Sequence, residues 1–122
     1  LRELGIDDPS GYEVLNSRNS PLVGRAVDHL YTRLQRRGFL RREIERMVNQ
    51  DRNYFAAAML ALGEADAMIT GVTRPFSQSL RQVEMVIDHD EGPRPFGINI
   101  IVGQNRTVLI ADTAVTDRPT AA

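Results

Sequence analysis

The sequence predicts an α/β fold, because segments with the periodicity of amphipathic helices alternate with short β-rich segments. The helical pattern is clearest between residues 20 and 37, and two apolar β-rich runs, residues 98–102 and 107–110, flank a polar turn. The 122 residues, 42% hydrophobic and 25% charged, suit one globular domain or part of one.

Charge and composition limit the classes of partner. Fifteen Lys plus Arg residues face sixteen Asp plus Glu residues, so the net charge is -1 at pH 7 and gives no overall field to attract nucleic acid or an anionic membrane. The chain has no cysteine, which excludes disulfides, zinc–thiolate sites and cysteine nucleophiles. No apolar run approaches the roughly 20 residues that a membrane-spanning helix needs. We expect a cytoplasmic protein without nucleic-acid or membrane partners.

The first 19 residues are expected to form a linker and an edge strand, with the strand at residues 12–15. In the helix that follows, Ser20 is a good N-cap and Pro21 a good first residue, because the N–H that proline lacks would have no partner there. Leu34 completes the apolar stripe of this helix, and Gly38 ends it.

Two more helices complete a helical part at residues 20–63. One is predicted at residues 41–49, with Ile44, Met47 and Val48 inward. The other is predicted at residues 54–62 and has no polar face, so we expect it to be buried on several sides within a larger structure.

A sheet-containing part is expected at residues 64–122. It begins with a buried strand at residues 67–70, and Ser77 is the predicted N-cap of a helix that runs to about residue 87. After a loop, the β-rich runs at residues 98–110 have the pattern of a hairpin.

The ends of the sequence indicate a fragment. The first residue is not Met, and residues 116–120 resemble the opening of a helix that the sequence does not complete. We therefore expect residues 1–122 to be part of a larger domain, cut before its next helix.

Several short motifs carry a family resemblance. An apolar helix at residues 53–59, a turn Gly-Glu-Ala-Asp at residues 63–66 and a short strand that ends in Thr70-Gly71 resemble those of phosphate acetyl- and butyryltransferases. With residues 71–76 and 107–121, the pattern is most similar to the phosphotransacetylase-like half of NADP-dependent malic enzymes. The resemblance covers about residues 20–122. It implies a three-layer phosphotransacetylase-like fold, also found in isocitrate and isopropylmalate dehydrogenases, present here as a fragment.

The resemblance also implies a site for acetyl-CoA or phosphate at Thr70, Gly71, Ser77 and Arg81. Ligands of α/β proteins bind at the carboxyl ends of strands, where Gly71 would permit close backbone approach and Thr70 would supply a hydroxyl. The next helix would offer its N-terminal N–H groups to an anion. The arginine of the acyltransferases that matches Arg81 is similar to a phosphate or acyl-phosphate clamp. The alternatives are a surface arginine and an ordinary strand end with a turn glycine.

Two departures from the family pattern lead us to expect no catalytic residue in this segment. The acyltransferases carry a phosphate-binding arginine where Leu34 stands here, and Arg33 and Arg37 are expected to point elsewhere. The serine, arginine and aspartate that surround the reacting thiol in the family would lie beyond Ala122.

The function that the resemblance implies is therefore regulatory. It is an oligomerising segment that binds acetyl-CoA or a related acyl-CoA in an NADP-dependent malic enzyme. Oxidative decarboxylation of malate to pyruvate, NADP and the Mg²⁺ or Mn²⁺ ion would belong to a catalytic N-terminal half in cis, so no cofactor is expected in this segment. The first alternative is a fragment of a standalone phosphate acetyltransferase.

The second alternative is a nucleic-acid-binding module based on the arginines of residues 33–46. Glu43 and Glu45 interrupt this basic region, so a solvated, salt-bridged surface is the favoured interpretation. The acidic cluster of residues 88–91 is interpreted as a solvated loop and not as a metal site, because four consecutive residues do not converge easily on one ion. His29 is expected on the polar side of its helix, without a general-base role.

Overall fold

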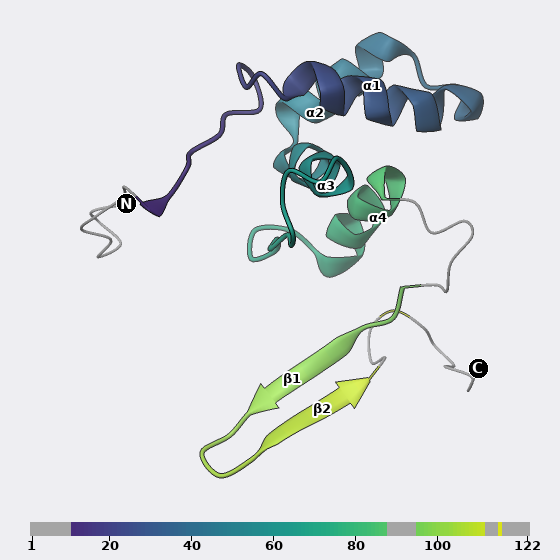
Figure 1. Ribbon diagram of the computed structural model, residues 1–122. Helices are drawn as coiled ribbons and strands as arrows, with labels where there is room; N and C mark the ends of the chain where they lie inside the picture. The colour runs from purple at the N-terminus through teal and green to yellow at the C-terminus, as the bar shows by residue number, and fades with distance from the viewer. Residues whose placement is uncertain (1–10, 88–94, 112–114, 116–122) are drawn as a thin grey trace. The chain divides into compact units, whose positions relative to one another are not determined.

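The computed structural model describes residues 11–87, 95–111 and 115. The chain divides into two compact units, Leu1–Ile87 and Asp88–Ala122, called here the helical unit and the hairpin unit. Among the described residues, the helical unit contains four α-helices and the hairpin unit contains a two-stranded antiparallel sheet (Figure 1). The mixed helix and strand content agrees with the α/β prediction at this coarse level. The three-layer arrangement stays a prediction.

The first predicted helix is confirmed as α1 (Val23–Leu34). The predictions that Ser20 is its N-cap and Pro21 its first residue are wrong, because the helix begins at Val23 with Leu22 in the N-cap position. The Ser20 hydroxyl accepts a hydrogen bond from the Leu22 N–H at 3.3 Å in the turn before the helix. A 3₁₀ turn (Gln35–Arg37) follows, and Gly38 ends the segment with a φ of 90°, a conformation that favours glycine.

The second and third helices are confirmed as α2 (Arg41–Gln50) and α3 (Arg52–Ala61). α3 begins two residues earlier than predicted because the Asp51 carboxylate accepts a hydrogen bond from the Asn53 N–H at 2.9 Å, a typical N-cap contact. The exposed Arg52 therefore belongs to the first turn of the helix, which the apolar pattern alone does not show.

The fourth helix is α4 (Phe76–Val86), and the prediction that Ser77 is its N-cap is wrong. The helix already includes Phe76, and the N–H groups of Gln78 and Ser79 donate to the carbonyl oxygen of Pro75. Proline fixes φ near the helical value, so the chain enters the helix at Pro75 without a side-chain cap.

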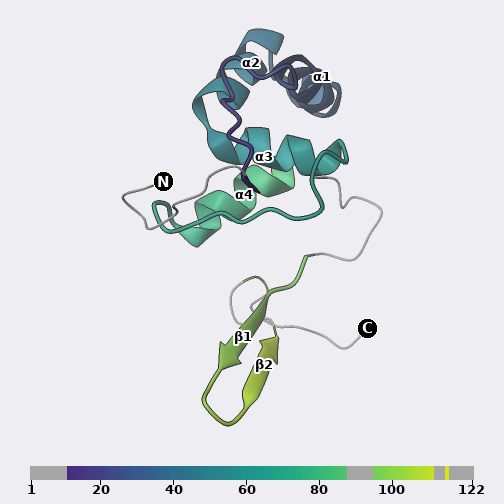
Figure 2. The same cartoon turned by 60° about the vertical axis from the view of Figure 1, so that its left-hand side comes forward.

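α3 is central to the helical unit and contacts α1, α2 and α4. Both views show it between the α1–α2 pair and α4 (Figures 1 and 2). All four helices contribute to one apolar core, whose large fully buried side chains are Leu30, Leu34, Ile44, Val48 and Val86. The apolar stripes that the periodicity predicted are thus the buried faces of α1 and α2.

Neither predicted short strand is present in the helical unit. Residues 12–15 and 67–70 are irregular, and Ile69 is fully exposed instead of buried. A strand exists only as part of a hydrogen-bonded ladder, and the described part of this unit contains no strand that could pair with either segment. Apolar composition indicates a strand but says nothing of its partner.

The predicted hairpin is confirmed as β1 (Ile98–Val102) and β2 (Thr107–Ala111). Ile98 pairs with Ala111 and Val102 with Thr107, and the Gly103 N–H donates to the Arg106 carbonyl at 2.9 Å to close the loop. All residues of both strands are exposed.

Two further expectations fall on residues 88–91 and 116–120, which lie outside the described residues. No helix in the described part of the chain is long and apolar enough to cross a membrane.

Candidate functional site

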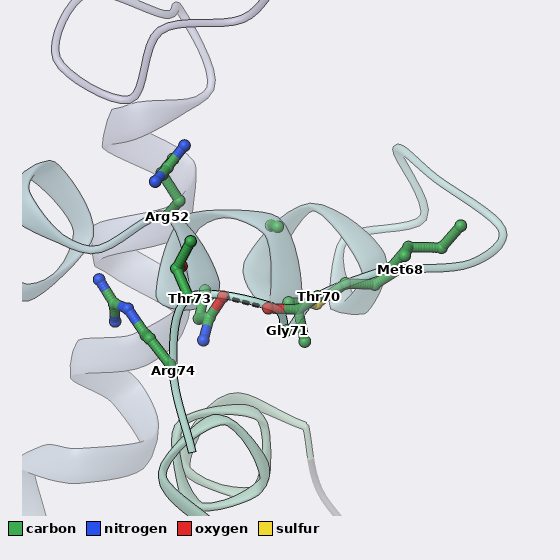
Figure 3. A pocket seen from close by; sticks show the side chains of 9 residues that line it. Arg52, Met68, Thr70, Gly71, Thr73 and Arg74 are labelled. Atoms are coloured by element: carbon green, nitrogen blue, oxygen red, sulfur yellow. Dashed lines mark hydrogen bonds between the residues drawn. The ribbon is translucent and has the colours of Figure 1, made fainter. Parts of the chain in front are cut away.

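A cavity of about 270 Å³ lies beside the first turns of α3 and the loop that joins α3 to α4 (Figure 3). Its polar lining includes the hydroxyl residues Thr70 and Thr73 and the cationic residues Arg52 and Arg74. No carboxylate is among the described residues that line it. Two guanidinium groups and two hydroxyls without a lining carboxylate favour an anionic ligand.

A second cavity, of about 310 Å³, borders the same loop and is more apolar. Val72, Phe76 and Leu80 line it, and it shares Thr70, Gly71 and Arg74 with the first cavity. The loop therefore offers a cationic pocket and an apolar pocket with a common border.

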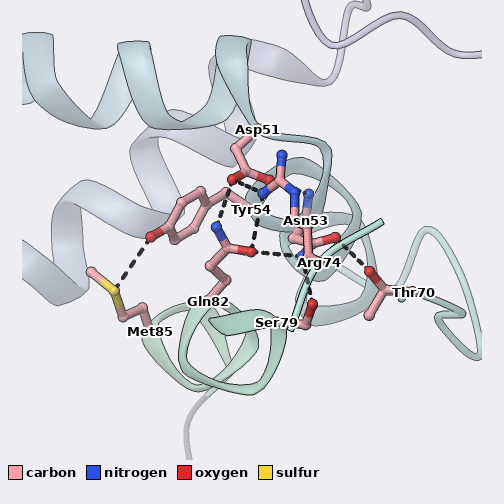
Figure 4. A network of polar contacts seen from close by, with 8 residues as sticks. All are labelled: Asp51, Asn53, Tyr54, Thr70, Arg74, Ser79, Gln82 and Met85. Carbon is pink, nitrogen blue, oxygen red and sulfur yellow. Dashed lines mark hydrogen bonds and ion pairs between the residues drawn. The ribbon is translucent and has the colours of Figure 1, made fainter. Parts of the chain in front are cut away.

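The buried side chain of Asn53 connects this loop to both neighbouring helices (Figure 4). Its Oδ1 accepts a hydrogen bond from the Thr70 hydroxyl at 2.6 Å, and its Nδ2 donates to Gln82 Oε1 at 2.6 Å and to Ser79 Oγ at 3.5 Å. Asn53 is 7% exposed, as is Gln82, so these bonds replace water for two desolvated amides. This network fixes Thr70 at the cavity edge.

Asp51 extends the network to Arg74. One carboxylate oxygen caps α3, and the other accepts from Gln82 Nε2 at 2.6 Å and forms an ion pair with the Arg74 guanidinium. The Arg74 guanidinium also lies 3.4 Å from Gln82 Oε1. Asp51 therefore couples the start of α3, the loop and α4.

The backbone of the loop is strained where the two cavities meet. Gly71 has a φ of 132° and Val72 a φ of 64°, and the Thr73 N–H donates to the Gly71 carbonyl at 2.8 Å. An i to i+2 hydrogen bond around a positive φ is the rare and strained form of γ-turn. For a β-branched residue such as Val72 this strain costs about 1–3 kcal/mol and is found mostly at functional sites.

The four predicted site residues do not converge. Thr70 and Gly71 line both cavities, whereas Ser77 and Arg81 are exposed on α4 and line neither of them. Arg81 has no hydrogen bond or ion pair to the described residues, and its role in ligand binding stays a prediction. Leu34 lies in the core with 1% of its surface exposed, as its place in the apolar stripe predicted.

Most residues of the site were not predicted: they are Asp51, Arg52, Asn53, Thr73, Arg74, Ser79 and Gln82. The N-cap residue type of Asp51, directly before an apolar helix, was a signal that was available in the sequence. The others look like ordinary polar residues of a helix or a loop.

His29 and the basic region also have structural partners. His29 is half-buried instead of lying on a fully polar face, and its Nε2 lies 3.1 Å from the carbonyl oxygen of Val86 at the end of α4. Arg41 pairs with Asp28 at 2.5 Å and with Glu45 at 3.7 Å, as expected for a salt-bridged surface. The absence of nucleic-acid binding stays a prediction.

Tyr54 supplies a pH-dependent prediction. Burial raises the pKa of its hydroxyl above the ordinary value of 10.0, the charge of Asp51 raises it further, and Arg74 opposes the shift. The hydroxyl donates to the Met85 sulfur at 3.6 Å. A phenol whose pKa is higher in the folded state stabilises the fold below the unfolded pKa, and this contribution is lost as the pH rises through the folded pKa.

We expect the urea midpoint of the chain to fall above about pH 10 and to fall less in Tyr54→Phe. The chain has no lysine and no cysteine, so neither of these side-chain types contributes to an alkaline change in stability. Equal alkaline loss in the two proteins would contradict the assignment to Tyr54.

Comparison with known proteins places the chain in a family. The family described as phosphate acetyl/butaryl transferase matches residues 2–122. The chain is 51% identical over 118 residues to an NADP-dependent malic enzyme of Rhizobium meliloti, covering 96% of this chain and 16% of the relative. It is 36% identical over 120 residues to a probable NADP-dependent malic enzyme of Rickettsia prowazekii, covering 98% of this chain and 16% of that protein.

A third relative is the NADP-dependent malic enzyme of Escherichia coli, 27% identical over 124 residues, or 99% of this chain and 16% of the relative. The chain thus spans about 16% of the length of these curated relatives.

Proposed function

We propose that this chain, which belongs to the phosphate acetyl/butaryl transferase family, is a regulatory segment of an NADP-dependent malic enzyme that binds acetyl-CoA or a related acyl-CoA. The observation that carries the proposal is 51% identity, over nearly the whole chain, to a protein named as an NADP-dependent malic enzyme. Malate oxidation, NADP and the divalent ion are assigned in this proposal to a separate catalytic part of the same cytoplasmic polypeptide.

The paired cavities support an acyl-CoA ligand. Acyl-CoA combines anionic phosphates with an apolar acyl and thiol end. The cavity with Arg52 and Arg74 suits the anionic groups, and the neighbouring cavity with Val72, Phe76 and Leu80 suits an apolar group. Thr70 and Gly71 lie at the border where the two parts of such a ligand would meet.

The core position of Leu34 supports a segment that binds acyl-CoA but does not transfer the acyl group. The position where the family resemblance implies a phosphate-binding arginine is occupied by a leucine in the core, 1% exposed. The segment is therefore proposed to retain ligand binding and to contribute no catalytic group.

Homo-oligomerisation is the second part of the proposal. Most residues of β1 and β2 expose apolar side chains, including Ile100 at 64% and Leu109 at 67%. Contiguous exposed apolar surface marks sites of protein association.

The test is an acetyl-CoA titration of malate-dependent NADP reduction by the full-length protein, in wild type and in Arg81→Ala. If Arg81 contacts the ligand, loss of its charge-assisted hydrogen bond should raise the acetyl-CoA concentration for half-maximal effect roughly tenfold to a hundredfold. Folding should change little, because Arg81 is exposed and alanine is a good helix former.

Arg42→Ala is the matched control, because Arg42 is also an exposed helical arginine and lines neither cavity. Equal half-maximal concentrations in Arg81→Ala and the control would show that Arg81 has no role in acetyl-CoA binding. The absence of any acetyl-CoA effect on wild type would contradict the regulatory function itself.

A further inference from the structure

Arg52 is a cation without a described partner at the edge of the 270 Å³ cavity. It is exposed, lines that cavity and has no hydrogen bond or ion pair to the described residues. As the first residue of α3, it also lies at the positive end of the helix dipole, where a cation is disfavoured. An anion bound beside Arg52 would give it a partner and would offset the unfavourable interaction with the helix dipole.

Arg74 contributes a second cation to the same cavity from the loop. Its side chain is 30% exposed and is held by Asp51, whose side chain is 16% exposed. The Arg74 guanidinium is therefore partly desolvated, and the residue lines the same cavity as Arg52, Thr70 and Thr73.

Asp51 does not depend on Arg74 for hydrogen bonding. If Arg74 turned away, the Asp51 carboxylate would keep the Asn53 N–H at 2.9 Å and Gln82 Nε2 at 2.6 Å. Gln82 Oε1 would likewise keep its bond from Asn53 Nδ2 at 2.6 Å. Exchange of the Arg74 partner leaves neither of these acceptors unsatisfied, which removes the main cost of such a movement.

We infer that Arg52 and Arg74 form a phosphate-recognition site, and that the bound phosphate group replaces Asp51 as the partner of Arg74. Planar guanidinium groups bind phosphate oxygens in bidentate geometry, and the hydroxyls of Thr70 and Thr73 can donate to the same oxygens. A volume of about 270 Å³ is below the usual range for a whole drug-sized ligand, so it suits one phosphate group and its immediate neighbours. The inference deepens the proposed function and rests on it in taking acyl-CoA as the larger ligand.

If phosphate replaces Asp51 as the partner of Arg74, two substitutions should change phosphate affinity in opposite directions. Arg52→Ala removes a cation from the site and should weaken binding roughly tenfold or more, the loss expected for one charge-assisted hydrogen bond. Asp51→Asn removes the carboxylate that competes for Arg74 and should strengthen binding several-fold. Asparagine is as good an N-cap as aspartate, so α3 should still form in this variant. Its amide nitrogen replaces the oxygen that accepts from Gln82 Nε2, so that one hydrogen bond is lost.

The experiment is isothermal titration calorimetry of the full-length protein with two probes, inorganic phosphate and acetyl-CoA. Wild type, Arg52→Ala, Asp51→Asn and the control Arg42→Ala are compared after circular dichroism has checked that each is folded. We expect weaker binding of both probes by Arg52→Ala, tighter binding by Asp51→Asn and a change of less than about twofold in the control.

The outcomes separate this inference from the proposed function. Phosphate binding that depends on Arg52, without acetyl-CoA binding, would keep the phosphate site and overturn the acyl-CoA proposal. Acetyl-CoA binding that is equal in Arg52→Ala and the control would keep the proposed function and overturn the phosphate site. Weaker or unchanged binding in Asp51→Asn would show that Asp51 does not compete for Arg74, and binding of neither probe by wild type would overturn both.

Discussion

Leu34→Arg is expected to unfold the helical unit instead of creating an anion site. Leu34 is 1% exposed in the core, and loss of a buried leucine side chain typically costs about 2–5 kcal/mol. A guanidinium buried among apolar side chains adds several kcal/mol more because it has no compensating partner there. The sum approaches the whole free energy of unfolding of a typical domain, about 5–15 kcal/mol.

Urea denaturation followed by circular dichroism measures this effect, with Leu34→Met as the control of similar volume. The methionine variant should lose less than about 1.5 kcal/mol, because it keeps the position apolar and filled. A cooperative transition near the wild-type midpoint in Leu34→Arg, together with new phosphate binding, would show that the position can open to solvent. It would also show that a single substitution at this position creates an anion site.

The burial of Leu34 bears on whether this chain can perform the acyl transfer of its family. Periodicity alone predicted that this side chain faces inward with the rest of the α1 stripe, and the structure confirms it. The chain belongs to the family, yet the position where the resemblance implies a phosphate-binding arginine holds a core leucine. Belonging to the family therefore does not by itself imply the family's chemistry.

Local patterns were enough for the helices and the hairpin. The three- and four-residue spacing of α1, the turn at Gly38 and the β-rich runs around residues 103–106 are all visible over short stretches of sequence. The strand predicted at residues 67–70 failed because a strand also requires a partner, which composition does not reveal.

Two of the four predicted site residues, Ser77 and Arg81, lie outside the cavities, because the site is formed by contacts between segments that are distant in sequence. Thr70 and Gly71 line the cavities, but the residues that hold Thr70 in place are distant in sequence. Asn53 lies 17 residues before Thr70 and 29 before Gln82, so no short motif joins them. Polar residues that meet only after three segments have packed together are not recognisable from one sequence.

Asn53→Leu is the second substitution with a large expected effect. It keeps a similar side-chain volume but removes the acceptor for Thr70 and the donor for Gln82 and Ser79. A buried polar group left without its partner costs about 1–3 kcal/mol, and both Gln82 and Ser79 are buried. Thr70 is exposed and can bond to water, so we expect a total loss of roughly 2–4 kcal/mol in the free energy of unfolding.

Asn49→Leu is the matched control, because Asn49 Oδ1 is buried and has no hydrogen-bond partner among the described residues. Removing an amide whose oxygen is already unsatisfied should be nearly neutral or slightly stabilising. Urea midpoints of the two variants give the comparison directly. A loss confined to Asn53→Leu means that the network, and not amide burial in general, stabilises the loop between α3 and α4. Equal midpoints would mean that Thr70 and Arg74 are positioned by the backbone alone, in which case the strained turn at Val72 must be held by the packing of α4.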